Sequence, residues 1–236
     1  MQKLLSHMRA ACQQYEMIKE GDRIAIGVSG GKDSMALLAG MANLRRFYPE
    51  KFEIVAITLD PRFNNQDADY TEIEKFCKNA GIEYVIKRTQ LAEVIFDIRK
   101  ESNPCSLCAR MRRGALHDAA KEHSCNKIAL GHHLDDLAET FIMNLFNGGT
   151  LDCFMPITYL SRKDIYMIRP MIFARESDCA RVVRKENLPV VKSSCPADGN
   201  TERQEVKEML SALEKKYGDV RSKILGAMQR KEINGY

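Results

Sequence analysis

The feature that most constrains this fold is a glycine- and serine-rich turn between a predicted strand and a predicted helix. Residues 23–28 form a short apolar run typical of a buried strand, and residues 33–47 carry apolar side chains at helical spacing. The turn between them directs backbone N–H groups and the positive end of the helix dipole toward one point. The junction therefore predicts an anion-binding site, with phosphate as the expected anion.

Strand-like and helix-like segments alternate along the rest of the chain. Further strands are expected at residues 52–59, 82–86, 127–130 and 165–168. This alternation predicts an α/β fold with a doubly wound, mostly parallel sheet, in which ligands bind beyond the carboxyl ends of the strands. We expect a single domain over residues 1–236, with a helical insertion near 91–123 and a helical C-terminal region near 193–236.

Composition narrows the class of protein. No apolar run among the 236 residues approaches the roughly 20 needed to cross a bilayer, and residues 1–20 lack the apolar core of a secretory signal. We therefore expect a cytoplasmic protein with no membrane partner. The net charge of +4 is compatible with a polyanionic partner without identifying one. The eight cysteines are not expected to form a disulfide framework, and metal or redox chemistry is the better explanation for any clustered subset of them.

Residues 29–34, with the sequence Ser-Gly-Gly-Lys-Asp-Ser, resemble the signature of the PP-loop ATPases. The serine hydroxyls can bind phosphate oxygens, the glycines let the backbone approach closely, and Lys32 and Asp33 suit phosphate and Mg²⁺ respectively. The simpler alternative is a tight turn that needs glycine. The resemblance implies a Rossmann-like fold of the PP-loop (HUP) type that binds ATP and Mg²⁺. Its nucleotide-binding residues would be Ser29, Gly30, Gly31, Lys32, Asp33 and Ser34.

A second segment, residues 131–140, resembles the second conserved motif of PP-loop enzymes that modify tRNA. Gly131 would let the nucleotide pack against a strand end. Asp135 and Asp136 would bind Mg²⁺ or orient a substrate group, or else only complement the positive end of a helix. Asp60, at the end of the second strand, either faces the same crevice or serves as a turn residue. We expect Asp60, Gly131, His132 and Asp135 to bind the nucleotide, and Lys32, Asp33 and Asp136 to be catalytic.

The cysteines supply a third candidate site. Cys105 and Cys108 are three residues apart in a predicted helix, so their thiols can share one side of it and chelate a soft metal. Cys195 is a third candidate ligand far along the chain. Three thiolates could also hold zinc, with Asp198 or water as the fourth ligand. The remaining cysteines have no ligand spacing and are expected to be core or surface thiols.

Together these motifs resemble the tRNA 2-thiocytidine synthetase (TtcA) family over nearly the whole chain. In that family three cysteines hold a [4Fe-4S] cluster with one iron free of protein ligands, and Cys105, Cys108 and Cys195 match them by position. One departure is that Asp198 stands where the family usually has a further cysteine. Basic residues are candidates for RNA phosphate contacts. They are Arg110, Arg112, Arg113, Arg169, Arg175, Arg181, Arg184 and Lys185.

The resemblance implies an ATP-dependent tRNA sulfurtransferase that adenylates a base carbonyl, of cytidine in the first instance, and replaces its oxygen with sulfur. Its expected partners are tRNA and a cysteine desulfurase or another sulfur donor, and a homodimer is compatible with the sequence. Three alternatives stay open. One is a cluster-free ligase like tRNA lysidine synthetase, another is thiolation of a small molecule, and the third is a nucleotide-binding redox or metal sensor.

Overall fold

The computed structural model describes residues 1–63, 66–98, 104–192, 195 and 202–236. Its centre is a six-stranded sheet with the strand order β3-β2-β1-β4-β6-β5. The strands are β1 (Asp22–Gly27), β2 (Phe52–Asp60), β3 (Glu83–Arg88), β4 (Lys127–Ala129), β5 (Ile157–Leu160) and β6 (Ile165–Ile168). All neighbouring strands pair in parallel except β5 and β6, which are antiparallel. This arrangement confirms the predicted α/β architecture.

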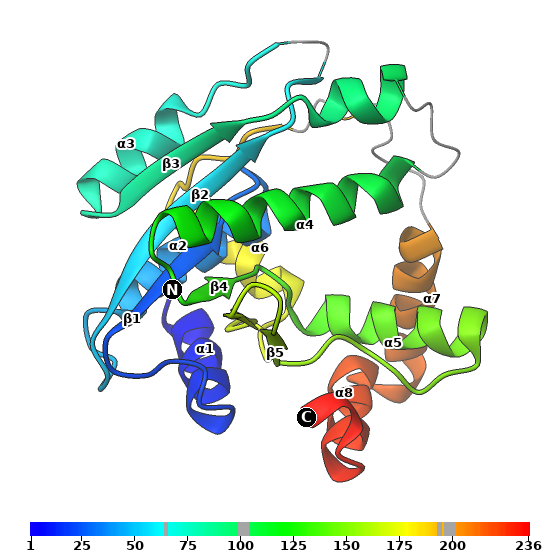
Figure 1. The fold of residues 1–236 in the computed structure, drawn as a ribbon. Coiled ribbons are helices and arrows are strands. Elements are labelled where there is room, and N and C mark those ends of the chain that lie inside the picture. Colours follow the sequence, from blue (N-terminus) through cyan, green and yellow to red (C-terminus); the bar gives the residue numbers. More distant parts are fainter. Residues whose placement is uncertain (64–65, 99–103, 193–194, 196–201) are drawn as a thin grey trace.

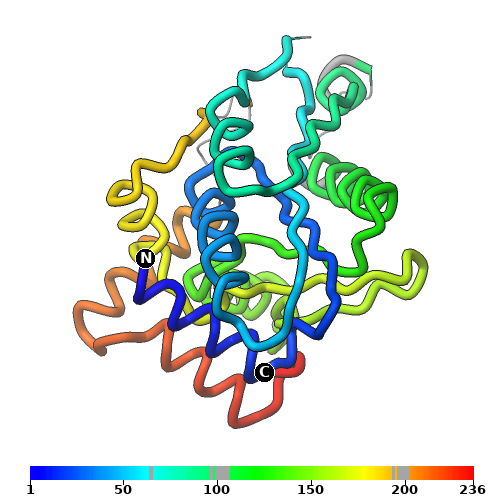
Figure 2. Tube along the Cα trace, turned by 90° about the vertical axis from the view of Figure 1, so that its left-hand side faces the viewer, coloured from blue at the N-terminus to red at the C-terminus, as the bar shows by residue number. Residues whose placement is uncertain are grey.

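Helices follow most strands and cover both faces of the sheet. They are α1 (Gln2–Gln14), α2 (Lys32–Leu44), α3 (Thr71–Asn79), a π-helix η2 (Glu93–Ile98), α4 (Pro104–Glu122), α5 (Leu134–Gly148), α6 (Glu176–Lys185), α7 (Glu202–Tyr217), α8 (Val220–Arg230) and a short 3-10 helix η3 (Ile233–Gly235). Figures 1 and 2 show α4 on one face of the sheet and α2 on the opposite face. In the described part of the chain, no helix has both the length and the apolar character that crossing a membrane requires.

The central strands are buried on both faces, and their side chains alternate between two cores. From β1, Ile24 and Ile26 join the larger core, which is completed by α1, α2, α3, α6 and α8. Ala25 points the other way and packs with Leu116 and Ala119 of α4. Because both cores are closed, β1 and β2 read as nearly continuous apolar runs rather than as alternating ones.

The predicted strands agree with the observed ones, but β5 was not predicted. β5 has only four residues and forms the antiparallel edge of the sheet beside β6, with Tyr159 exposed. An edge strand this short, half covered by the core, carries too little hydrophobic periodicity to be recognised. The helical character expected near 91–123 and in the C-terminal region is present as η2, α4, α7 and α8 within the described residues.

Candidate active site

The predicted phosphate turn connects the end of β1 to the start of α2. Gly30 has a positive φ of 83°, and a Cβ there would lie 3.0 Å from the Cβ of Val191, so both the backbone conformation and the space require glycine. Ser34 ties the turn together, because its Oγ donates to the Gly31 carbonyl (2.9 Å) and accepts from the Ser29 amide (3.2 Å). No side chain caps the N-terminus of α2, so its first N–H groups are available to an anion.

Lys32 and Asp33 open α2, and their side chains form an ion pair. The Nζ of Lys32 lies 2.9 Å from Oδ2 of Asp33 and 2.9 Å from Oε1 of Glu176, at the start of α6. Burial lowers the pKa of Lys32, but the hydrogen bonds that its ammonium donates to these two carboxylates, together with their charges, outweigh burial and raise the pKa above its ordinary value. Oδ1 of Asp33 is buried and has no hydrogen-bond partner among the described residues. That oxygen is suited to a bound cation.

The second motif begins at the end of β4, directly beside the phosphate turn. A Cβ on Gly131 would lie 3.3 Å from the backbone of Asp33 and Ser34. The close packing of the two motifs thus favours glycine here, a reason different from the expected contact with the nucleotide. His133 then caps α5, with its Nδ1 accepting from the Asp136 amide while its own amide donates to Asp136 Oδ2.

The two neighbouring aspartates of this motif have different surroundings. Asp136 lines the same cavity as Asp33. Asp135 is 5% exposed and turned away, accepting from the Glu176 amide at 2.7 Å and lying 3.0 Å from the guanidinium of the buried Arg221 in α8. The geometry therefore gives Asp136 access to a bound metal or substrate, whereas Asp135 holds α5, α6 and α8 together.

Asp60, at the end of β2, is buried and hydrogen-bonded to backbone amides. It is 1% exposed, and its two carboxylate oxygens accept from the amides of Arg62 and Ala68, each at 3.0 Å. These bonds hold the loop that follows β2. The structure does not bring Asp60 into the lining of the cavity, and it favours the alternative of a turn residue.

The cavity that these motifs share has a volume of about 670 Å³. The phosphate-turn residues Ser29, Asp33 and Ser34 line it together with Gly131 and Asp136. Its opposite wall is α4, which contributes Arg112, Arg113, Leu116 and His117. The cavity lies at the carboxyl ends of β1 and β4 and extends over the face of the sheet covered by α4. It can accommodate a nucleotide and part of a second substrate.

A polar wall formed by His132 and Arg169 borders the cavity beyond β4. Arg169 is 5% exposed, its Nε donates to Nδ1 of His132 at 3.3 Å, and its guanidinium lies over the ring of Phe154 at 4.9 Å. The imidazole of His132 stacks on the same ring. Burial, together with the charge of Arg169, lowers the pKa of His132 well below its usual value, so this imidazole is neutral at pH 7.

Two of the metal-ligand candidates lie at the start of α4. Cys105 and Cys108 belong to its first two turns, so the cavity-lining Arg112 follows Cys108 by about one turn of the same helix. The Cys108 and Cys195 side chains are partly exposed. The side chain of Cys105 and the whole of Asp198 lie outside the described residues.

The other five cysteines are buried core thiols, as expected. Burial raises their pKa, to about 12 for Cys12, Cys77 and Cys153 and to about 11 for Cys125. Cys179 also has a raised pKa through burial. A thiol that stays protonated is a poor metal ligand, which argues against a metal-binding role for these five.

Two residues near the cavity were missed by the sequence reasoning. Glu139, one turn after Asp136 in α5, is 4% exposed, and burial and the Asp136 charge raise its pKa to about 7. Arg203 in α7 places its Nη1 3.1 Å from Oδ1 of Asp136 and 3.7 Å from Oε2 of Glu139. Glu139 falls within the second motif and could have been suspected. The sequence around Arg203 contains no pattern that would have indicated its contact with the site.

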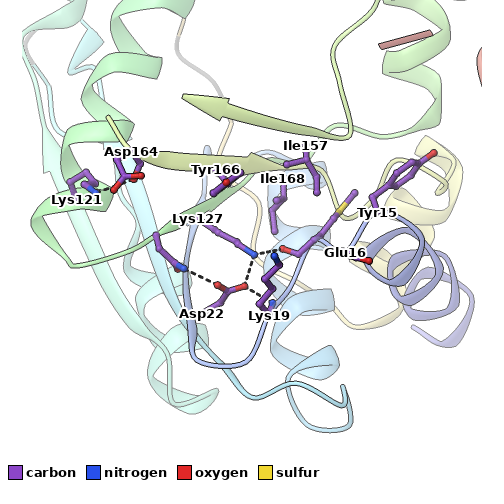
Figure 3. Close-up of a pocket in the computed structure, with 12 residues that line it drawn as sticks. Tyr15, Glu16, Lys19, Asp22, Lys121, Lys127, Ile157, Asp164, Tyr166 and Ile168 are labelled. Atoms are coloured by element: carbon purple, nitrogen blue, oxygen red, sulfur yellow. Dashed lines mark hydrogen bonds and ion pairs between the residues drawn. The ribbon is translucent and has the colours of Figure 1, made fainter. Parts of the chain in front are cut away.

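A second cavity, of about 490 Å³, lies at the amino ends of β1 and β4 (Figure 3). Its buried charges satisfy one another: Lys127 Nζ lies 2.6 Å from Asp22 Oδ2 and donates to the Met17 carbonyl, and Asn126 donates to Asp22 Oδ1. Ligands of open parallel sheets bind at the opposite edge. This cavity is therefore not the candidate active site.

Comparison with known proteins agrees with this geometry. Residues 3–213 match the family described as the PP-loop domain. The chain is 38% identical over 221 residues to the tRNA-cytidine(32) 2-sulfurtransferase of Syntrophotalea carbinolica, covering 92% of this chain and 85% of that protein. It is 35% identical over 229 residues to the protein of the same name from Citrifermentans bemidjiense, covering 96% and 89% of the two chains.

Solved structures share the fold. The U34-tRNA thiolase NcsA from Methanococcus maripaludis, solved with its [4Fe-4S] cluster, superposes with a TM-score of 0.75 at 24% identity, covering 96% of this chain and 78% of the other. An NMN synthetase from Francisella tularensis gives a TM-score of 0.53 at 15% identity over 98% and 92% of the two chains. By the extent of the family match and the identity to its curated relatives, the chain belongs to the PP-loop family and, within it, to the tRNA-cytidine 2-sulfurtransferase (TtcA) family.

Proposed function

We propose that this protein is an ATP-dependent tRNA sulfurtransferase that adenylates the C2 carbonyl of a cytidine and replaces its oxygen with sulfur. The observation that carries the proposal is the convergence of two features on one cavity. The phosphate turn and Asp136 form one side, and α4, which begins with the Cys105–Cys108 pair, forms the other. The relatives' name, tRNA-cytidine(32) 2-sulfurtransferase, supports the same substrate.

In the first step the carbonyl oxygen bonds to the α-phosphorus of ATP, and the bond to pyrophosphate breaks. The amides at the start of α2 and the hydroxyls of Ser29 and Ser34 bind the phosphate oxygens, since they line the anion end of the cavity. Lys32 supplies positive charge beside them. Asp33 and Asp136 hold Mg²⁺, a hard cation that prefers carboxylate oxygens.

In the second step hydrosulfide attacks C2. The bond from C2 to oxygen then breaks, and AMP leaves with that oxygen while the sulfide proton is released. No electrons are transferred overall, so the reaction consumes ATP and sulfide and yields AMP, pyrophosphate and the thiocarbonyl. The sulfur comes from sulfide itself, or from a cysteine desulfurase whose persulfide a thiol reductant first converts to sulfide by a two-electron reduction.

The residues at the start of α4 fit an iron–sulfur cluster. Cys105 and Cys108 are three residues apart in the first two turns of a helix, where the helix dipole favours thiolates, and Cys108 and Cys195 are the described cysteines that are not fully buried. We infer that Cys105, Cys108 and Cys195 hold a [4Fe-4S] cluster. If bound there, the cluster would supply a thiophilic iron, left open by the three-cysteine set, that can carry the sulfide.

The tRNA enters from the side of α4. Arg112 and Arg113 line the cavity there and provide salt-dependent contacts to RNA phosphates. A target base that is unpaired in a loop can be turned out of its stack and inserted into the cavity.

Nucleoside mass spectrometry of tRNA from cells with and without the protein tests this function. Loss of 2-thiocytidine on deletion, together with pyrophosphate release that requires both tRNA and sulfide in the purified system, is the expected result. Unchanged thionucleosides would refute it. Pyrophosphate release without tRNA would instead identify a small-molecule substrate, and the Ser34→Ala variant controls for contaminating ATPases.

A further inference from the structure

Helix α7 brings a guanidinium to the acidic side of the candidate active site. Nη1 of Arg203 lies 3.1 Å from Oδ1 of Asp136, and its other nitrogen, Nη2, donates to the Thr140 hydroxyl at 3.3 Å. Glu139 adds a second carboxylate at 3.7 Å. Asp136 lines the cavity with the phosphate-turn residues, so Arg203 stands one side chain away from the position proposed for the phosphates.

One turn further along α7, Lys207 continues the same basic face. Its Nζ lies 2.6 Å from Oε2 of Glu176, whose other oxygen lies 2.9 Å from Nζ of Lys32 in the phosphate turn. Burial raises the pKa of Glu176, but these two lysines outweigh it and hold the pKa at about 2. Glu176 is therefore a fixed anion that holds Lys32 on one side and α7 on the other.

The Arg203 contact is not needed to attach α7. Val206 and Leu210 of α7 are buried against Ala138 of α5, which fastens the helix by apolar packing. The Arg203 side chain itself is 43% exposed. A long, exposed guanidinium that ends on a cavity carboxylate is free to change partner without moving its helix.

Binding of Mg²⁺ and ATP changes the electrostatics at this point. A divalent cation on Asp136 repels the guanidinium beside it, while the phosphates offer new acceptors in a geometry that arginine binds with two parallel hydrogen bonds. We propose that Arg203 is a phosphate ligand of this enzyme, held by Asp136 in the empty site and transferred to the nucleotide's phosphates when Mg²⁺ occupies Asp136. The inference rests on the proposed function only in that ATP binds at the phosphate turn and Mg²⁺ binds at Asp136.

If Arg203 moves from Asp136 to the phosphates, its substitution should have effects that the loss of a purely structural ion pair would not have. In Arg203→Gln, the affinity for Mg²⁺–ATP falls by about tenfold or more, because a charge-assisted contact is lost. The affinity for the metal alone rises severalfold, because the competing positive charge has left Asp136. Arg203→Lys restores the metal affinity to the wild-type value but recovers only part of the ATP affinity, because an ammonium lacks the planar fork.

Two titrations of the holoenzyme test the proposal. Calorimetry measures the affinity for Mg²⁺–ATP, and electron paramagnetic resonance measures the affinity for Mn²⁺ added without nucleotide. Lys215→Gln is the matched control, since it removes an exposed cation from the last turn of the same helix. Opposite shifts of the two affinities in Arg203→Gln support the proposal. Unchanged ATP affinity, or equal weakening of both ligands, overturns it. A wild-type enzyme that binds ATP normally but thiolates no tRNA would overturn the proposed function and leave this inference standing.

Discussion

Nε2 of His133 lies 3.7 Å from Oδ1 of Asp33, and this approach joins the two sequence motifs of the site. Nδ1 of the same imidazole accepts from the Asp136 amide, so Nε2 is the ring nitrogen that faces Asp33. His133 thereby caps α5 and lies beside a carboxylate of α2 with the same ring. It is buried, and it was not among the predicted site residues.

Separate substitutions distinguish these two roles of His133. His133→Ala should lower the free energy of unfolding by about 1 kcal/mol through loss of the cap, and should also weaken Mg²⁺–ATP binding. His133→Asn keeps a capping oxygen but is too short to reach Asp33, so it should recover the stability without the affinity. Denaturant unfolding and calorimetry measure the two effects. Recovery of both by asparagine would show that the Asp33 contact is unimportant.

Asp135 and Asp136, neighbours in α5, should respond differently to substitution by asparagine. Asp136→Asn keeps the helix cap and should reduce pyrophosphate release by at least tenfold with little loss of stability, since the metal loses a charged ligand. Asp135→Asn should destabilise the fold by about 3 kcal/mol, because buried Arg221 loses a charged partner. Thermal unfolding and single-turnover assays compare the pair. An inactive but fully stable Asp135→Asn would contradict its structural assignment.

Substitutions should also distinguish the three proposed cluster ligands from the buried cysteines. Cys105→Ala, Cys108→Ala and Cys195→Ala should each lose iron and abolish thiolation while binding ATP as before, because the phosphate turn is a separate element. Cys125→Ala is the control, since that thiol is buried under α4 and has a raised pKa. Iron content and 2-thiocytidine yield are the measurements. Wild-type iron in any of the three variants would remove that cysteine from the ligand set.

Glu139 should make the stability depend on pH. Its pKa of about 7 in the folded protein lies above the ordinary 4.5, so the folded state binds more protons between these values. The contribution of Glu139 to stability is therefore fully present below pH 4.5 and is lost as the pH rises toward 7. Glu139→Gln should be more stable than the wild type at pH 8, by about 1 kcal/mol or more, with a smaller difference at pH 5. An equal difference at both pH values in urea denaturation would contradict the assignment.

Two glycines offer a matched test of packing. A Cβ on Gly131 would lie 3.3 Å from the Asp33 backbone, so Gly131→Ala should shift the phosphate turn and weaken ATP binding as well as stability. Gly114 lies within α4 with nothing within 4 Å of its added Cβ, so Gly114→Ala should stabilise the protein by about 0.5–1 kcal/mol. Thermal melts with and without ATP compare them. Tolerance of alanine at 131 would show that the two motifs are not tightly packed.

The parts that could be predicted depend on local patterns. The apolar runs of β1 and β2 identify buried strands whatever surrounds them, and the glycines and serines of the turn identify an anion site. These features gave the fold class and placed Ser29, Asp33, Ser34 and Gly131 around one cavity. The short edge strand β5 lacked such a pattern and was missed.

The remaining parts depend on how distant elements dock. Asp135 and Asp136 differ by about 100° around α5, and only the positions of α6 and α8 decide which of them faces the cavity. The environment of Asp60 likewise depends on the loop after β2. Arg203 follows Asp136 by 67 residues, so no spacing within either motif could have indicated their contact.

Helix α4 connects the two parts of the proposed reaction, ATP binding beside β1 and sulfur transfer at the cysteines. Leu116 touches the end of β1, and Cys105 lies eleven residues earlier on the same helix, at about 1.5 Å per residue. The distance along α4 from the end of β1 to the proposed cluster ligands is therefore set by residue count, whereas their angle around the helix changes by about 100° with each residue. Inserting or deleting one residue between Cys108 and Arg112 would rotate both cysteines by about 100° relative to the cavity-lining Arg112, although every motif in the sequence would remain intact.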